Sequence, residues 1–204
     1  MKFLEGSGKL IRNEQFLIGI DGTNYIATIP SSGIFDFNLN IASGSHIITV
    51  TNPYDGLTER FNLEILPTIF ADRFTKLLGD GSSYSVFFID RNGTPLINTN
   101  VDVIIDGIKY DYRTNEFGEI NVDMELAPKS YLVTVINPDS GEYIESIINV
   151  YAPIIENRDL VMYYTGGNYY TVKIIGHDGK AVGSGVPVKF SIAGKNYNVK
   201  TDRN

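Results

Sequence analysis

The side chains that could act in catalysis are few and far apart in this sequence of 204 residues. It contains two histidines, His46 and His177, and no cysteine. A Ser-His-Asp hydrolase needs its three groups within hydrogen-bond reach of one another, and neither histidine lies in a pattern that specifies such a set. The lack of cysteine excludes a thiol nucleophile, thiolate metal sites and disulfides. We therefore predict no catalytic residues and no enzyme activity.

Carboxylates in predicted turns are the remaining candidates for metal ligands. Calcium prefers six to eight oxygen ligands, and turns rich in carboxylates can meet at a junction between domains. However, the sequence has no D-x-D-x-D-G loop, and aspartate favours turns because its side chain hydrogen-bonds the nearby backbone. We predict no metal and no cofactor, with calcium at a junction as the alternative. The turn carboxylates are Asp90, Asp106, Glu116, Asp139, Asp178 and Asp202.

Two pairs of tyrosines are the best candidates for ligand contact. Tyr163-Tyr164 and Tyr169-Tyr170 flank the segment 165–168, and in strands one member of each pair must face outward. An exposed tyrosine can stack on a sugar ring or bind a protein partner. We predict ligand contact at Tyr163, Tyr164 and Tyr169, with ordinary cross-strand aromatic pairing as the structural alternative.

The overall composition is typical of a folded chain that does not bind nucleic acid. Hydrophobic residues make up 43% of the sequence and charged residues 20%, which does not fit a disordered protein. Thirteen tyrosines and eleven phenylalanines favour strands. The net charge of −7 argues against a nucleic-acid partner, because such a partner requires a basic face.

The sequence repeats itself at an offset of 85 positions. Ile20–Tyr25 falls on Ile105–Tyr110, and Asn52-Pro53 falls on Asn137-Pro138. In the 50 aligned positions from Ile20 to Ile69, 13 residues are identical. A fixed period of this kind reveals an array of similar modules, which typically holds something at a distance or presents a surface many times.

A third copy begins near Ile154, where Asp178-Gly179 corresponds to Asn92-Gly93. Met1 aligns with Val86, so the first copy enters partway through the pattern, and the last copy stops early. We expect the natural protein to be longer on both sides. The predicted domains are a first module (1–68) without its first strand or strands, a complete middle module (69–153), and a third module (154–204) that ends before its last strands.

The middle module shows the alternation and turns of short strands. Apolar and polar residues alternate in Ser83–Ile89, turns follow every 8 to 14 residues, and no stretch has a helical period. About seven short antiparallel strands in 85 residues are typical of an immunoglobulin-like sandwich, so we predict an all-β fold of tandem Ig-like sandwiches. The residues that we assign to structural turns and to a corner are Asn92, Gly93, Asp106, Gly107, Gly118 and Tyr131.

The incomplete modules carry their own expectations. In the first module, Phe35–Ile41 alternates apolar and polar residues and predicts a strand with one dry face. His46 stands where the middle module has Tyr131, so we interpret it as a half-buried structural residue. His177 is expected to be a turn residue.

The third module should hold about four strands and be the least stable part of the chain, because some 50 residues rarely bury enough apolar surface alone. Its bare strands should pair readily with another chain, and the first module has the strands that it lacks, which would allow head-to-tail complementation. Pro67 and Pro153 mark short, stiff joints, so neighbouring modules are expected to form a semi-rigid rod. The uncovered apolar residues are Tyr170, Val172, Ile174, Val188 and Phe190.

Three motifs occur in order: Asp90–Pro95, Thr114–Gly118 and Leu126–Tyr131. Together they resemble the Ig-like repeats of large bacterial and archaeal surface proteins, above all the adhesin-like proteins of methanogenic archaea. That family reads roughly as a D-x-N-G-x-P turn, a T-D-x-N-G turn and an L-x-x-G-x-Y corner. The first module departs from this pattern at Ser7-Gly8 and at His46, which indicates a drifted copy.

The resemblance implies an extracellular, cell-surface setting. The predicted function is a non-enzymatic stalk or spacer of an adhesin-like protein that mediates or presents cell adhesion. Its expected partners are the neighbouring repeats and a host or microbial surface protein or glycan. The alternative function is an accessory spacer or carbohydrate-binding module of a secreted glycoside-acting enzyme.

Overall fold

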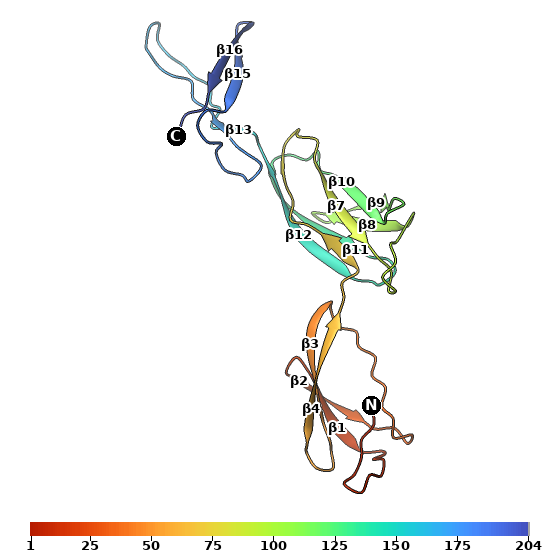
Figure 1. Cartoon of the computed structure of the whole chain (residues 1–204). Coiled ribbons are helices and arrows are strands. Elements are labelled where there is room, and N and C mark those ends of the chain that lie inside the picture. Colours follow the sequence, from red (N-terminus) through yellow and green to blue (C-terminus); the bar gives the residue numbers. More distant parts are fainter. Residues whose placement is uncertain (204) are drawn as a thin grey trace. The chain divides into compact units, whose positions relative to one another are not determined.

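The structure is a computed structural model that describes residues 1–203. Its regular elements are all β-strands and none of the described residues lies in a helix, which confirms the all-β class (Figure 1). Among these residues there is consequently no helix that could cross a membrane. The chain divides into two compact units, Met1–Pro67 and Thr68–Asn204. The second unit contains both the middle and the third module.

Two sheets build the middle module, one with strand order β10-β7-β5 and one with order β6-β12-β11-β8-β9. All neighbouring strands are antiparallel except β6 and β12, which are parallel. The expectation of purely antiparallel strands was wrong for this pair, because the chain leaves β5 and three residues later joins the opposite sheet as β6. The strands are β5 (Ile69–Ala71), β6 (Thr75–Leu77), β7 (Ser83–Phe88), β8 (Asn100–Ile105), β9 (Ile108–Arg113), β10 (Glu119–Asp123), β11 (Lys129–Ile136) and β12 (Tyr143–Tyr151).

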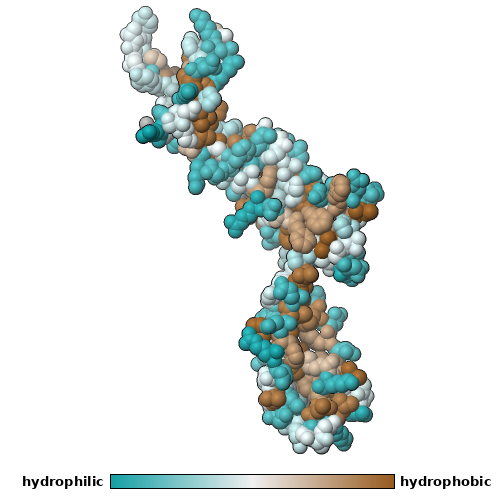
Figure 2. Space-filling model, viewed as in Figure 1, coloured by the Kyte–Doolittle hydropathy of each residue, from teal (hydrophilic) through white to brown (hydrophobic). Residues whose placement is uncertain are grey.

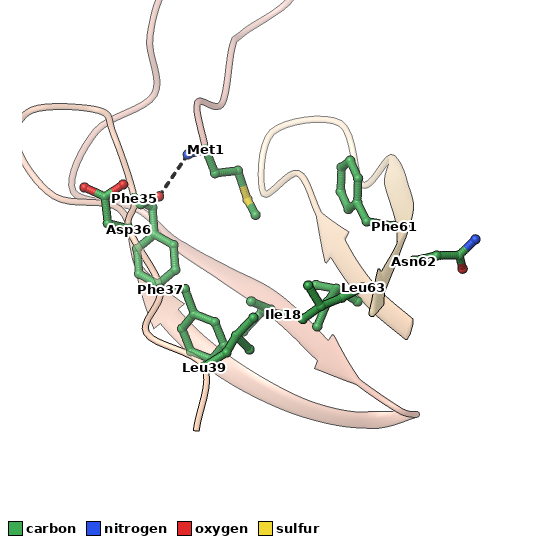
Figure 3. Close-up of a pocket in the computed structure, with 10 residues that line it drawn as sticks. Met1, Ile18, Phe35, Asp36, Phe37, Leu39, Phe61, Asn62 and Leu63 are labelled. Carbon is green, nitrogen blue, oxygen red and sulfur yellow. Dashed lines mark hydrogen bonds between the residues drawn. The ribbon is translucent and has the colours of Figure 1, made fainter. Parts of the chain in front are cut away.

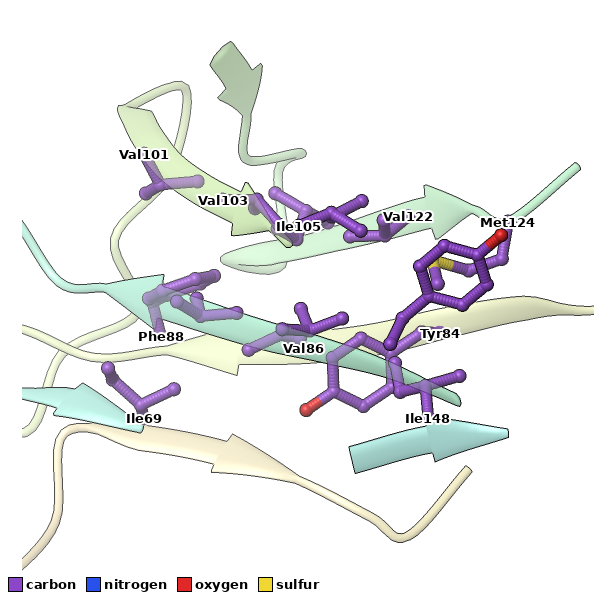
Figure 4. Packing of buried hydrophobic residues seen from close by; sticks show 14 of the residues in the cluster. Ile69, Tyr84, Val86, Phe88, Val101, Val103, Ile105, Val122, Met124 and Ile148 are labelled. Carbon is purple, nitrogen blue, oxygen red and sulfur yellow. The ribbon is translucent and has the colours of Figure 1, made fainter. Parts of the chain in front are cut away.

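The core of this module lies between the two sheets. Strand β7 directs Tyr84, Val86 and Phe88 inward, and each is at most 1% exposed. Figure 4 shows these side chains in one cluster with Val103 of β8, in the opposite sheet, and Val122 of the neighbouring strand β10. Full burial of such an apolar side chain stabilises the fold by about 1.5–3 kcal/mol. The alternation seen in the sequence is therefore the alternation between core and solvent.

Turns hold the strands in register at the positions that the sequence marks. Asp106 and Gly107 form the two-residue link between β8 and β9, with φ angles of 47° and 82°, as a type I′ turn requires. Asn92 and Gly93 lie in the turn after β7, where Gly93 has φ 83°. Gly118 precedes β10 with φ 81°, and a Cβ there would lie 2.8 Å from a carbonyl oxygen of β7. Only glycine fits that position without strain.

The first module repeats one of these sheets and not the other. It has a four-stranded sheet of order β2-β1-β3-β4. Adding 85 to the bounds of these strands reproduces β9, β8, β11 and β12 to within one residue. The core residues are Phe3, Ile11, Phe16, Ile18, Ile29, Ile48 and Val50. The strands are β1 (Gln15–Ile20), β2 (Thr23–Thr28), β3 (Gly44–Thr51) and β4 (Thr58–Ile65).

The strand predicted for Phe35–Ile41 is not present. In the middle module the equivalent strand, β10, pairs with β7 over five residue pairs. In the first module that ladder is reduced to a single bridge between Lys2 and Ile34. The prediction was wrong because alternation specifies which face is buried, whereas a strand also needs a partner for its backbone groups.

The third module has four short strands in two separate two-stranded sheets. They are β13 (Ile154–Ile155), β14 (Lys173–Ile174), β15 (Pro187–Ile192) and β16 (Lys195–Lys200). Among its described residues Ile175 is the one buried hydrophobic side chain, whereas Tyr170 is 60% exposed and Phe190 38%. Little apolar surface is thus removed from water in this module.

Candidate functional site

An open apolar groove on the first module offers a binding surface. It has a volume of about 580 Å³ and lies between the segment that follows Gly33 and the strands β3 and β4. Figure 3 shows Phe35 and Phe37 along one wall and Leu63 with Phe61 along the other. Apolar colours gather on this unit in Figure 2. The lining residues are Met1, Ile18, Phe35, Asp36, Phe37, Leu39, Ile48, Phe61, Asn62 and Leu63.

The middle module shows what normally fills this space. There Tyr84 is 1% exposed, pairs with Val122, and its hydroxyl lies 3.2 Å from the Ser146 Oγ. By the 85-residue offset, Val122 corresponds to Phe37 and Ser146 to Phe61. In the first module the groove therefore occupies the space that Tyr84 of strand β7 fills in the middle module.

A second, smaller hollow of about 270 Å³ adjoins the groove, and Met1 and Phe61 line both. It is also bordered by Phe3, Leu4 and Val50. In the middle module the counterpart of Phe3 pairs with Ile69 of β5. The smaller hollow therefore corresponds to the place of that first strand.

The groove offers apolar surface rather than reactive groups. Asp36 is the one charged side chain of its lining, and Phe37 and Phe61 are 41% and 49% exposed. The Met1 amine donates to the Phe35 carbonyl at 3.0 Å, and the Phe35 N–H donates back to the Met1 carbonyl at 3.0 Å. Beyond this pair, the segment Asp36–Ile41 belongs to none of the sheets.

The corner of the first module is built on a histidine. His46 Nε2 lies 2.8 Å from the Ala42 carbonyl oxygen, and in the middle module the Tyr131 hydroxyl donates to the equivalent carbonyl of Ala127 at the same distance. His46 Nδ1 lies 2.7 Å from Asp21 Oδ2. These bonds, with Asp21 first, raise the pKa of His46. The bond from His46 and the Ile47 N–H lower the pKa of Asp21.

A buried lysine in the second unit was missed by the sequence analysis. Lys76 has no exposed surface, and its Nζ lies 2.6 Å from the Ser82 carbonyl, 3.2 Å from Glu125 and 3.7 Å from both Asp80 and Asp123. The sequence feature that could have revealed this burial is the position of Lys76 two residues after Phe74, since Phe74 packs against the core. Full pairing is what permits a buried ammonium group.

Asp80 links this cluster to the third module. Burial acts to raise its pKa, but hydrogen bonds from Ser82 and Leu77 and the charge of Lys76 lower the pKa of Asp80 to about 2. His177 Nδ1 lies 3.3 Å from Asp80, and Thr75 donates its hydroxyl to the His177 carbonyl at 2.8 Å. His177 therefore joins the two modules as well as lying in a turn.

Two of the turn carboxylates, Asp90 and Asp178, bind the backbone of their own turn, whereas Asp106 and Asp139 accept bonds from distant residues. Asp90 accepts the N–H groups of Asn92 and Thr94 at 2.8 Å each, and Asp178 accepts the Lys180 N–H at 3.0 Å. No group of three or more histidine and acidic side chains within residues 1–203 could hold a metal ion.

The tyrosines proposed for ligand contact lie on the surface of the third module. Tyr163, Tyr164 and Tyr169 are 91%, 97% and 90% exposed, and they lie outside any strand. Both members of the first pair face solvent, whereas strands would have required only one of them to face outward. Without a strand to impose alternation, neither side chain is directed to a core.

No protein-family model matches this sequence, and no curated protein matches it. Among solved structures, domains 4 and 5 of the S-layer protein SbsC are similar with 16% identity and a TM-score of 0.28, over 74% of this chain and 80% of that one. A Ca²⁺-stabilised adhesin with which an Antarctic bacterium binds ice is similar with 15% identity and a TM-score of 0.27. That match spans 95% of this chain and about half, 55%, of the adhesin. Similarity at this level transfers no function.

Proposed function

We propose that this chain is a non-enzymatic, extracellular repeat segment, a stalk or spacer of an adhesin-like cell-surface protein. The observation that supports it most is the repetition itself. Strands β1, β2, β3 and β4 recur as β8, β9, β11 and β12 at an offset of 85 residues. An array of this kind extends a chain and presents each module in turn. The turn motifs that resemble surface-protein repeats support the same function.

The test is to locate the protein on cells that express its natural parent. Antibodies raised against residues 69–153 should label intact cells, and brief protease treatment of those cells should remove the signal. Labelling that appears only after the cells are opened would overturn the proposal.

The exposed tyrosines favour a second candidate function, carbohydrate binding as an accessory module of a secreted glycoside-acting enzyme. Solvent-exposed aromatic side chains can stack on sugar rings. A glycan array should then show binding that is lost when Tyr163 and Tyr164 are both changed to Ser. The matched control is Tyr143→Ser, since Tyr143 is also exposed, at 64%, but lies on the middle module. An array without a single positive glycan would reject this function.

A further inference from the structure

The middle and third modules are fastened to each other by side chains as well as by the chain between them. The Thr75 hydroxyl donates to the His177 carbonyl at 2.8 Å, and the Asp80 carboxylate lies 3.3 Å from His177 Nδ1. The Tyr151 ring lies against Gly179, where a Cβ would come within 2.7 Å of the tyrosine hydroxyl oxygen. Three residues of the middle module therefore contact one turn, residues 176–180, of the module that follows.

We propose that Thr75, Asp80 and Tyr151 form a docking surface for the next repeat, which holds the middle and third modules in one fixed orientation. This inference rests on the proposed stalk function for its purpose. Relative motion is the default between neighbouring domains, and a flexible joint shortens the distance over which a stalk can project. A docked turn removes that freedom at this joint.

The linker between the two modules has no slack. The Tyr151 carbonyl accepts the Leu78 N–H of the middle module at 2.9 Å, and the Pro153 carbonyl accepts the Ile175 N–H of the third module at 2.9 Å. Strand β13 then pairs with β14, and Figure 1 shows β12 leading directly towards β13. Ala152 alone lies between the carbonyls that are bonded to one module and to the other. The docking surface therefore has to restrain rotation only about this point.

The docking surface is held in place by its own module. Asp80 accepts the N–H of Leu77 at 3.0 Å and the N–H and hydroxyl of Ser82 at 2.9 and 2.7 Å. It also lies 3.7 Å from the buried Lys76 ammonium group, and its side chain is 13% exposed. These contacts fix the carboxylate that faces His177, so little conformational entropy is lost when the turn docks.

The docked turn is equally preformed. Asp178 accepts the Lys180 N–H at 3.0 Å, the Gly179 N–H donates to the Gly176 carbonyl at 3.0 Å, and the Gly176 N–H donates to the Lys180 carbonyl at 2.8 Å. Gly179 has φ 74°, a conformation that favours glycine, and the Tyr151 ring fills the space that a Cβ would need. Glycine is therefore required at this position for two independent reasons, one in the turn and one in the docking.

The middle module contains the same turn with different contacts. Arg91 stands at the position of His177, and its N–H donates to Asp139 of its own module at 3.0 Å. Gly93 stands at the position of Gly179, with φ 83°, and a Cβ there would meet nothing within 4 Å. At Gly93 only the backbone conformation requires glycine, so this turn supplies a matched control.

Residual dipolar couplings of the 204-residue chain test the proposal, because they report the orientation of each backbone amide. We expect the amides of the middle and third modules to fit one alignment tensor. Tyr151→Leu should separate them into two tensors. Leu66 occupies the equivalent position of the first module, so leucine is compatible with this strand end. Two tensors in the unmodified chain, or a single tensor that survives Tyr151→Leu, would overturn the proposal.

Gly179→Ala distinguishes docking from strain within the turn. We expect this variant to give two tensors, whereas Gly93→Ala, which has the same cost in φ and meets no ring, should retain one. Added to Tyr151→Leu, Gly179→Ala should change the orientations no further, because the contact is already lost. If the two changes were additive, the effect would arise within the turn and docking by Tyr151 would be rejected. None of these results depends on where the protein lies on a cell, so docking and the proposed function can fail separately.

Discussion

The first and the middle module share one sheet and differ in the other. The sheet β2-β1-β3-β4 has the order of β9-β8-β11-β12, although only 13 of 50 aligned residues are identical. The opposite sheet is complete in the middle module and reduced to an isolated bridge in the first. This comparison indicates that one sheet of the sandwich forms through the pairing of its own strands. The other sheet depends on strand β7 and on Tyr84, which β7 places between the sheets.

Removing that tyrosine should produce the largest effect. Tyr84→Ala is expected to destabilise the middle module by about 3–5 kcal/mol, because a large buried side chain leaves a cavity. Amides of β10 should lose protection in hydrogen exchange first, since they pair only with β7. The change would make the middle module resemble the first.

The matched control is Tyr84→Phe. It removes only the contact between the hydroxyl and Ser146 at 3.2 Å, and should cost about 1 kcal/mol or less. If the phenylalanine variant were as unstable as the alanine variant, the hydroxyl rather than the ring would be what completes the sandwich.

An asparagine that both modules share gives the next largest effect. Asn137 is fully buried, and its amide donates to the carbonyls of Thr68 and Ile89 at 3.1 and 2.8 Å. Asn137→Ala should destabilise the middle module by about 2–3 kcal/mol, because these buried carbonyls lose their donor.

A substitution of the equivalent Asn52 measures how much of this buried hydrogen bonding the first module retains. Its amide donates to the Leu4 carbonyl at 3.2 Å, the counterpart of Ile89. With one such bond in place of two, Asn52→Ala should cost about 1 kcal/mol in the first module. Hydrogen exchange resolved by module measures both variants. Equal losses in the two modules would show that the bond to Thr68 contributes nothing.

The repeat and the turns made most of the fold predictable from the sequence. The features that the sequence did not predict depend on which segments pair with one another. Asp106 and Gly107 predicted their hairpin because an Asp-Gly turn has few other conformations. The alternation of Phe35–Ile41 identified the face that packs against the core at Phe35 and Leu39. It did not determine whether a strand forms, because alternation does not specify a partner for the backbone groups. The parallel pairing of β6 with β12 joins segments that are distant in the sequence, and no local pattern marks it. The burial of Lys76 depends on distant Glu125 as well as on nearby Ser82, and its position two residues after Phe74 is its local signal.

The groove was not visible in the sequence for a similar reason. The groove becomes apparent only when Phe37 and Phe61 are compared with the residues that surround Tyr84 in the middle module. The exposure of Tyr163 and Tyr164 was foreseen only in part, because the sequence suggested strands where the structure has none. Their role in ligand contact stays a prediction.

The smallest expected effect is a difference in the pH dependence of stability between the first module, whose corner contains His46, and the middle module, whose corner contains Tyr131. Asp21 raises the pKa of His46 above its usual value of 6.5, so the protonated imidazole is favoured in the folded state. Its contribution to stability is complete below the unfolded pKa and is lost as the pH rises through the higher folded pKa. The pKa of Asp21 is lowered from 3.8, so its contribution is present above that value and is lost as the pH falls through the lower folded pKa.

The first module should therefore be most stable at weakly acidic pH and lose protection as the pH rises above 6.5 and through the higher folded pKa of His46. The middle module should not change in this range, because its corner is formed by a tyrosine and holds no histidine. Hydrogen exchange at a series of pH values, corrected for the intrinsic rate, would compare the amides of β3 and β11 in the same sample. His46→Tyr should remove the difference, since a tyrosine can donate to Ala42 as Tyr131 donates to Ala127. A loss of protection at high pH that survives this substitution would place its origin outside the corner.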